Sequence, residues 1–236
     1  VSLAKKINYQ SAGTVEFLLD DTTGKFWFLE MNTRLQVEHP VTEEVTGIDI
    51  VEQQLLIAAN QELIIAQQDV SWDGHAIEAR IYAEDPNNDF LPSTGKLIAN
   101  QIEPKDGIRW DSGVEAGMVI GTDFDPMMAK VIAHGSSRLD ASRKLAKELE
   151  STHFGGFSTN MEFLANILRH KEFILGNTTT DFIDRYNPSR SLVLEDSEQN
   201  FVAITAALWL QGLNRSQAVV LENIPSGWNN TRLPKQ

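Results

Sequence analysis

The sequence of 236 residues contains no cysteine, no long apolar run and far fewer basic than acidic residues. Without cysteine the chain cannot form disulfides, thiolate metal sites or a cysteine nucleophile. The longest apolar run, around residues 201–210, is about half the ~18 residues that a membrane-spanning helix needs. The 20 basic and 33 acidic residues give a net charge of −13. We therefore expect no nucleic-acid and no membrane partner, although a local basic pocket for a small anion remains compatible with this charge.

The composition is that of an ordinary folded protein. Hydrophobic residues make up 42% of the chain and charged residues 22%, a balance that argues against disorder. At about 150 residues per domain, a chain of 236 residues corresponds to one or two domains. The first residue is Val1 rather than Met, and residues 225–230 form a turn-rich stretch, so we expect the chain to be part of a longer protein.

The pattern of apolar residues predicts a mixed α+β fold. Two short apolar runs at residues 14–19 and 26–31 flank a turn-forming segment, which indicates a β-hairpin. Residues 75–83 alternate between apolar and polar side chains, as in a half-buried strand, and residues 91–135 contain further short strands. We expect helices at residues 49–60 (with Asp49 as N-cap), 138–150, 160–169, 180–186 and 201–213, irregular structure at 32–40, a polar linker at 189–200 and the start of a strand at 217–221.

The second strand of the hairpin carries the first candidate site. Side chains repeat every two residues along a strand, so Glu30 and Asn32 share one face. Because the strand is apolar on both faces, we expect it to be buried, and Glu30 then needs a proton, a partner or a cation. Glu16 on the first strand could meet Glu30 across the hairpin. Two carboxylates and an amide oxygen suit Mg²⁺ or Mn²⁺, and acids that are merely salt-bridged at a sheet edge are an equally good interpretation.

Polar residues directly after this strand form the second candidate site. Arg34, Gln36 and Glu38 place a cation, an amide and a carboxylate within five residues. An arginine fork suits carboxylate-like or phosphate-like anions, and Glu38 is a candidate general base. Taken alone, this segment also fits a solvated turn. Arg80 lies beside Glu78 on the polar face of its strand, where a surface ion pair worth under ~1 kcal/mol is the simpler interpretation.

Five segments of the sequence resemble the biotin carboxylase component of biotin-dependent carboxylases, a branch of the ATP-grasp ligases. The longest and most specific of them is EMNTRLQVEHPVTE at residues 30–43. The others are GHAIEARIYAEDP (74–86), FLPSTGK (90–96), DFDPMMAK (123–130) and GGFSTN (155–160). Together they extend the resemblance over roughly residues 1–187.

The resemblance implies an α+β fold with two parts. Residues 1–70 correspond to the C-terminal half of an ATP-grasp domain, and residues 71–188 to a biotin carboxylase C-terminal domain, an antiparallel sheet with flanking helices. Residues 189–236 are expected to be a linker and the start of the region leading to the next domain, and they resemble the corresponding region of long acyl-CoA carboxylase α subunits. The family's glycine-rich lid and ATP-binding lysines do not occur in this sequence, so we expect the chain alone to be inactive.

The resemblance also implies a reaction and its cofactors. Biotin carboxylases use ATP and bicarbonate to carboxylate biotin, which is carried on a separate carrier domain, by way of carboxyphosphate. Glu16 and Glu30 resemble the carboxylates that hold Mg²⁺ or Mn²⁺ on the ATP phosphates, with Asn32 assisting.

Five further positions correspond to the family's reacting groups. Arg34, Gln36 and the backbone of Val37 resemble its bicarbonate pocket, with Arg34 also counted among the catalytic groups. Glu38 resembles the base that deprotonates bicarbonate. Arg80 resembles the cation that stabilises the biotin enolate.

The implied partners are a biotin carrier domain and a carboxyltransferase subunit, with an oligomeric full-length protein. The implied location is the cytoplasm, or the mitochondrial matrix in a eukaryote. A non-catalytic interaction module and another ATP-grasp ligase are the alternatives. The combination of Arg80 with Arg34, Gln36 and Glu38 favours biotin carboxylase over other ligases, because those need neither a bicarbonate pocket nor a cation for an enolate.

Overall fold

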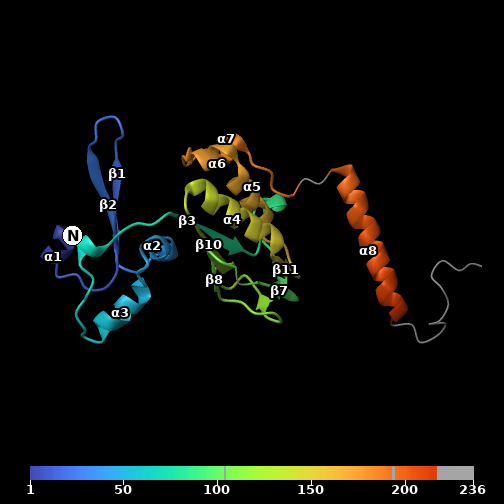
Figure 1. Cartoon of the computed structure of the whole chain (residues 1–236), viewed down its shortest axis with the longest axis horizontal. Helices are drawn as coiled ribbons and strands as arrows, with labels where there is room; N and C mark the ends of the chain where they lie inside the picture. Colours follow the sequence, from blue (N-terminus) through green and yellow to red (C-terminus); the bar gives the residue numbers. More distant parts are fainter. Residues whose placement is uncertain (104, 193–194, 217–236) are drawn as a thin grey trace, which may run out of the picture. The chain divides into compact units, whose positions relative to one another are not determined.

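The computed structural model describes residues 1–103, 105–192 and 195–216. The chain divides into two units, Val1–Leu192 and Val193–Gln236. The first unit contains antiparallel sheets with flanking helices (Figure 1), which confirms the predicted α+β class. Within the described residues, no helix combines the length and the apolar character needed to cross a membrane.

The predicted β-hairpin is confirmed. Strand β1 (Thr14–Leu19) pairs antiparallel with strand β2 (Phe26–Asn32), and Glu16 stands opposite Glu30 in the register. The turn is held by Asp20, whose Oδ1 accepts the backbone N–H of Thr22 at 2.8 Å. An Asp that accepts backbone N–H groups two and three residues ahead favours a tight turn, and the sequence Asp-Asp-Thr-Thr-Gly supplies it.

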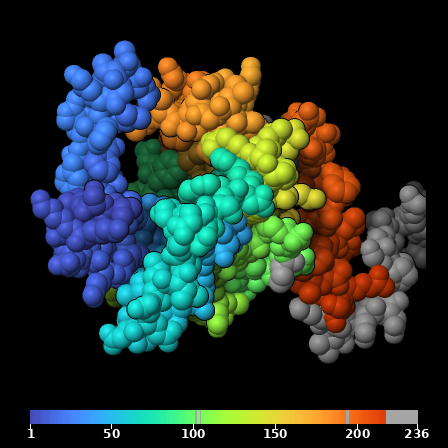
Figure 2. All heavy atoms as spheres, turned by 60° about the vertical axis from the view of Figure 1, so that its left-hand side comes forward, coloured from blue at the N-terminus to red at the C-terminus, as the bar shows by residue number. Residues whose placement is uncertain are grey.

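The predicted burial of β2 is wrong for the described residues. Phe26, Trp27, Phe28 and Leu29 are between 53% and 66% exposed. The N-terminal region that contains β2 is drawn in blue in Figure 2. An apolar pattern on both faces predicts burial only where a second layer covers each face, and no described residue supplies enough of that cover. Glu30 is exposed as well, so its charge needs no proton or partner on grounds of burial.

Short helices lie before the hairpin in the chain and between the hairpin and the central sheet. Helices α1 (Ser2–Lys6), α2 (His39–Thr46) and α3 (Ile50–Ala58), with the short 3₁₀ helix η1 (Gln67–Asp69), make up this region. Asp49 caps α3 as predicted, because its side chain accepts the backbone N–H of Glu52 at 2.8 Å. Helix α2 was not predicted as a helix, although Pro40 in its first turn and Gly47 in the left-handed region at φ +69° are ordinary helix-start and helix-stop residues.

A three-stranded antiparallel sheet forms the centre of the first unit. Its strand order is β3 (His75–Tyr82), β10 (Met127–Gly135) and β8 (Ile108–Ser112). Helix α4 (Arg138–Ser151) packs against all three strands, and helix α5 (Met161–Arg169) packs against α4 and β3 (Figure 1). Ile81, Val131 and Leu145 are fully buried between these layers. Each such side chain contributes about 1.5–3 kcal/mol relative to leaving it in water.

Smaller strands and helices complete the first unit, and they confirm the predicted run of antiparallel strands. The paired strands are β4 (Glu84–Asp85) with β5 (Leu91–Pro92), β6 (Gly95–Lys96) with β9 (Val119–Ile120), and β7 (Ala99–Gln101) with β11 (His153–Gly155). The remaining helices are η2 (Pro86–Asn88), α6 (Lys171–Leu175), which was not predicted, and α7 (Phe182–Tyr186).

The described part of the second unit is one helix, α8 (Asp196–Ser216). It begins before the predicted helix at residues 201–213, so the polar linker predicted at 189–200 is shorter than expected. An acidic first turn with Asp196 and Glu198 favours this earlier start. The strand expected at residues 217–221 and the turn-rich stretch at 225–230 lie outside the described residues.

Candidate functional site

The candidate side chains come from three neighbouring pieces of the chain: the open end of the hairpin, the loop that follows β2, and strand β3. Strand β2 ends at Asn32, and the loop then runs to Glu38, the N-cap residue of α2. Helix α2 packs against β3 and β10. This packing brings the start of α2 to the polar face of β3, so residues far apart in sequence meet there.

Two carboxylates face each other at the end of the hairpin. The Nδ2 of Asn32 donates to Glu16 Oε1 at 2.8 Å and to Glu30 Oε1 at 3.1 Å. In the described part of the chain, no Lys or Arg forms an ion pair with either acid. Like charges directly opposite each other across a ladder are unfavourable, so the amide N–H₂ bridges them at the point where a cation would be stabilised most.

This group fits a divalent cation only together with other ligands. Two carboxylates and an amide are hard oxygen donors of the kind that Mg²⁺ takes alongside substrate phosphates. To offer its oxygen, the Asn32 amide would have to turn over from the orientation in which its nitrogen faces the acids. Among the described residues, no group of three or more His, Asp or Glu side chains is placed to hold a metal ion. The site therefore needs phosphate oxygens or water to complete it.

The loop residues line one cavity. Arg34, Gln36 and Glu38 all border a cavity of about 250 Å³. Arg34 Nη1 donates to Gln36 Oε1 at 3.3 Å and to the backbone carbonyl of Leu35 at 3.2 Å. The Arg34 side chain is thus held at the rim of the cavity by its own loop, and neither bond is to a carboxylate. Its remaining N–H donors are left for an anion.

Arg80 contacts Glu38, which the sequence did not predict. Arg80 Nη2 donates to Glu38 Oε2 at 2.6 Å, a short charge-assisted hydrogen bond between residues 42 positions apart. The neighbour expected as its partner, Glu78, is 3.6 Å away from Arg80 Nε. Arg80 and Glu38 are 39% and 53% exposed, so solvent weakens their attraction and keeps both groups accessible.

Lys130 is a site residue that sequence reasoning missed. It lies on β10 directly opposite Arg80 in the ladder. Its Nζ donates to the backbone carbonyl of Val37 at 3.0 Å and pairs with Asp111 at 3.3 Å. Lys130 thus fixes the loop backbone at one of the predicted anion-binding residues. Its position at the end of the DFDPMMAK segment was the available signal, but nothing in that segment identified the lysine as a contact of the loop.

Glu78 is the second missed residue. Its side chain is only 5% exposed, and burial raises the pKa of the Glu78 carboxyl, an effect that the nearby charges of Lys130 and Arg80 oppose. Alternation correctly placed Glu78 on the face of Arg80. The expectation that this face is a solvated surface was wrong, because α2 packs against it.

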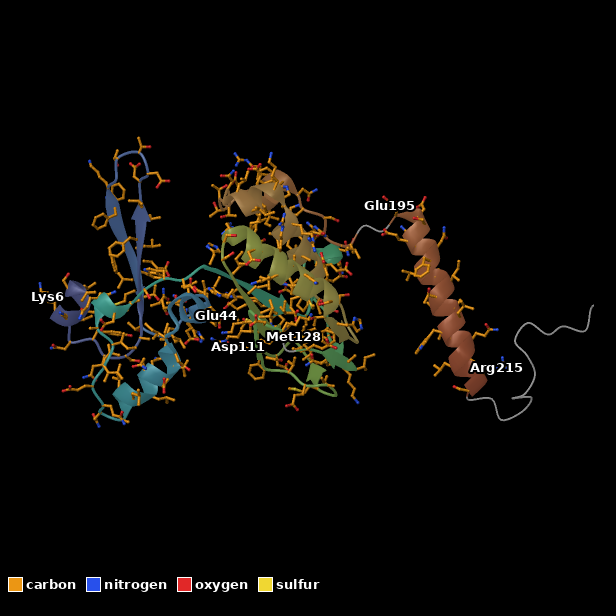
Figure 3. The ribbon with its side chains drawn as sticks, in the orientation of Figure 1. Lys6, Glu44, Asp111, Met128, Glu195 and Arg215 are labelled. Atoms are coloured by element: carbon orange, nitrogen blue, oxygen red, sulfur yellow. The ribbon has the colours of Figure 1, made fainter. Side chains whose placement is uncertain are left out.

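An ion-pair network fixes α2 on the sheet. Arg109 on β8 donates from Nη1 to Glu43 Oε2 at 2.7 Å and from Nε to Asp111 Oδ1 at 2.8 Å. Glu43 also accepts the backbone N–H of Ile50 at 2.8 Å, so its buried carboxylate is fully used. Glu44, labelled with Asp111 in Figure 3, lies 3.7 Å from Arg109. These bonds hold α2 on the sheet, and the helix in turn carries Glu38 at its N-cap beside β3.

Two protein families match the chain. Residues 1–66 match the family described as "Carbamoyl-phosphate synthase L chain, ATP binding domain", and residues 78–185 match "Biotin carboxylase C-terminal domain". Residues 78–185 thus form a biotin carboxylase C-terminal domain, and residues 1–66 form part of an ATP-binding domain. The acid pair and the cavity-lining loop lie in the first matched segment of the chain, and Glu78, Arg80 and Lys130 lie in the second.

The curated relatives are longer than this chain. Methylcrotonoyl-CoA carboxylase subunit alpha of Rattus norvegicus, a mitochondrial protein, is 45% identical over 202 residues, which are 84% of this chain and 28% of the relative. Biotin carboxylase 2 of Bacillus subtilis is 46% identical over 186 residues, 79% of this chain and 41% of the relative. The chain therefore spans less than half the length of either protein.

Among solved structures, the biotin carboxylase domain dimer of Hydrogenobacter thermophilus 2-oxoglutarate carboxylase is similar over most of the chain. The TM-score is 0.77 at 38% identity, over 81% of this chain and 42% of that one. That structure is a complex with MgADP, ADP and bicarbonate. The fold likeness thus extends to a protein that binds a nucleotide and the anion expected from the sequence.

Proposed function

We propose that the protein containing this chain is the biotin carboxylase of an acyl-CoA carboxylase, which uses ATP and bicarbonate to carboxylate biotin on a carrier domain. The observation that carries this proposal is the contact between Glu38 and Arg80 beside the cavity that Arg34 and Gln36 line. It joins a candidate base to a candidate cation next to a site for a small anion. An interaction surface has no need of that arrangement.

The anion-binding part of the reaction follows from the loop. Arg34, Gln36 and the backbone at Val37 bind bicarbonate, and Glu38 takes its proton. Bicarbonate oxygen attacks the γ-phosphorus of ATP, the bond to the bridging oxygen breaks, and ADP leaves. Mg²⁺ or Mn²⁺, when held by Glu16 and Glu30 with Asn32, neutralises phosphate charge that would otherwise repel the attacking anion.

The second half of the reaction uses Arg80. Carboxyphosphate breaks its carbon–oxygen bond to give CO₂ and phosphate, and phosphate takes the proton from the biotin ureido nitrogen. That nitrogen then forms the new bond to the CO₂ carbon. Arg80 stabilises the negative charge that develops on the ureido oxygen, which a fixed guanidinium does well in a partly enclosed site.

The wider assignments belong to the same proposal. We propose domain boundaries near residues 70 and 188, with residues 189–236 leading to the next domain. A carrier domain and a carboxyltransferase subunit are the proposed partners, within an oligomer, and the proposed location is the cytoplasm or, in a eukaryote, the mitochondrial matrix. The match with a longer methylcrotonoyl-CoA carboxylase subunit supports an acyl-CoA carboxylase. The chain by itself is expected not to turn over.

The test is biotin carboxylation by the whole protein, measured as ATP cleavage that requires both bicarbonate and biotin. Glu38→Gln and Arg80→Ala should each lower the rate at least about 100-fold, because each removes a reacting charge. Glu172→Gln, which alters a side chain on the remote helix α6, is the matched control and should leave the rate unchanged. ATP cleavage that ignores bicarbonate would favour another ATP-grasp ligase, and no cleavage at all would favour an interaction module.

A further inference from the structure

We propose that Glu78 is a positioning residue, which takes the Arg80 guanidinium when Glu38 leaves it to accept a proton from bicarbonate. The inference rests on the proposed function, because it assigns Glu38 and Arg80 the roles of base and cation. It adds a third residue to their pair, and it explains how the pair can separate during each turnover without Arg80 losing its place.

The contact between Glu38 and Arg80 supports the proposed reaction, but it must also break before Glu38 can accept a proton from bicarbonate. At 2.6 Å, the Nη2 of Arg80 occupies Oε2 of the carboxylate that has to reach bicarbonate. Once Glu38 holds a proton it is neutral, and most of its attraction for a guanidinium is gone. Arg80 then needs another counter-charge, or its long side chain is free to move into solvent.

Glu78 is placed to be that counter-charge. Arg80 Nε lies 3.6 Å from Glu78 Oε1, which is too far for a hydrogen bond but within one small shift of it. A different nitrogen of the guanidinium faces each carboxylate, Nη2 for Glu38 and Nε for Glu78. The Arg80 guanidinium can therefore approach Glu78 through Nε while Nη2 separates from Glu38.

The carboxylate oxygens of Glu78 are free to accept hydrogen bonds from the described residues around them. Its side chain is 5% exposed, and neither of its carboxylate oxygens accepts a hydrogen bond from a described residue. Buried polar atoms are rarely left without partners, since each costs free energy that a hydrogen bond would recover. The buried Glu78 carboxylate is therefore stabilised when the Arg80 guanidinium, released by Glu38, moves within hydrogen-bond distance of it.

The surrounding charges leave Arg80 as the cation able to do so. Lys130 stands opposite Arg80 across the ladder and also faces Glu78. Its Nζ is already committed to the carbonyl of Val37 at 3.0 Å and to Asp111 at 3.3 Å. Among the described residues, the Arg80 guanidinium forms a single side-chain hydrogen bond, and its partner is Glu38, the residue that must release it.

The experiment compares two rates in the whole protein. Glu78→Gln keeps the size of the side chain and removes its charge. We expect the rate of biotin carboxylation at saturating substrates to fall about tenfold, the size of effect expected from a misplaced reacting group. Bicarbonate-dependent ATP cleavage without biotin, and the KM values for ATP and bicarbonate, should change less than about twofold, because Glu38 and the bicarbonate pocket are untouched.

Two further variants make the comparison specific. Glu78→Asp retains the charge and should recover at least half of the lost rate. Glu148→Gln is the matched control for removing a buried acid, because Glu148 is 1% exposed and bonded to Lys105 and Trp110, away from the cavity. It should lower stability without separating the two rates.

The possible results distinguish the positioning role of Glu78 from a purely structural role and from failure of the proposed function. A selective loss of biotin carboxylation in Glu78→Gln, restored in Glu78→Asp, supports the positioning role. Equal losses in both rates make Glu78 merely structural, and unchanged rates make it unnecessary; either result overturns the role. If Glu78→Gln fails to fold, Glu78→Asp alone decides, since a carboxylate one methylene shorter should still lower only the biotin-dependent rate. A wild-type protein that carboxylates no biotin overturns the proposed function itself.

Discussion

The hairpin β1–β2 and the central sheet β3–β10–β8 have similar apolar strands and opposite surroundings. In the sheet, Ile81 and Val131 have no exposed surface, because α4 covers them. In the hairpin, Phe28 and Leu29 are more than half exposed. The apolar pattern of a strand therefore indicates which side chains can be buried. The free energy of burial is gained only where a second layer covers them.

The largest expected effect of this difference is on stability. Ile81→Ala should lower the free energy of unfolding of the chain by about 2–5 kcal/mol, because it removes a fully buried side chain and leaves a cavity. Phe28→Ala, at 57% exposure, should cost under about 1 kcal/mol although it removes a larger side chain. Urea unfolding followed by circular dichroism measures both. Comparable losses would mean that the hairpin is covered in solution, and the comparison would fail.

A smaller contrast is expected between two glycines with positive φ. Gly156 has φ +123°, and a Cβ there would lie 2.1 Å from the Lys96 carbonyl oxygen. Gly24 in the hairpin turn has φ +67°, with no atom within 4 Å of a Cβ. Gly156→Ala therefore adds a backbone clash to the conformational strain and should cost about 3 kcal/mol, against about 1 kcal/mol for Gly24→Ala.

The measurement for this pair is again urea unfolding, with the slope of the transition recorded for each variant. Because φ +67° lies near the left-handed well and φ +123° lies well outside it, the difference between the two positions reports the clash with Lys96 together with the greater strain at Gly156. A larger loss at Gly24 than at Gly156 would contradict the idea that the compact part of the unit tolerates change less than the hairpin does.

The fold was largely predictable from local patterns. The hairpin followed from two apolar runs around a turn, and α4 and α5 followed from their apolar periodicity. Helix α2 was missed because its eight residues include too few apolar positions to show a period. The exposure of β2 could not be predicted, because alternation describes the strand and not what covers it.

The site was predictable in its parts and not in its contacts. Glu16 and Glu30 could be paired from the hairpin alone, and Arg34 and Gln36 were indicated by the dense polar segment after its second strand. Val37 came from the family resemblance. The bond between Glu38 and Arg80 depends on where α2 packs, which the network around Arg109 determines. Glu78 and Lys130 escaped notice for the same reason, since each is an ordinary residue of a strand until the loop and α2 are placed against it.

The smallest expected effect concerns the pH dependence of stability. It tests directly whether α2 covers Glu78. Burial raises the pKa of Glu78 in the sheet, whereas the hydroxyl of Thr23 and then backbone N–H groups lower the pKa of Asp20 in the hairpin turn. A raised pKa means that the folded chain holds the proton more tightly, so the contribution of Glu78 to stability falls as pH rises above its ordinary value of 4.5. For Asp20 the contribution is present above 3.8 and is lost as pH falls.

These two opposite pH dependences can be measured separately. The experiment determines the free energy of unfolding of wild type, Glu78→Gln and Asp20→Asn between about pH 3 and 7. The stability of wild type relative to Glu78→Gln should decrease as pH rises, because only wild type has to ionise a carboxyl under α2. Its stability relative to Asp20→Asn should increase over the lower part of the range, because only wild type gains an ionised acceptor for the turn. Parallel slopes for the two variants would mean that cover by α2 does not govern the charge of Glu78, and the contrast between sheet and hairpin would then be one of apolar packing alone.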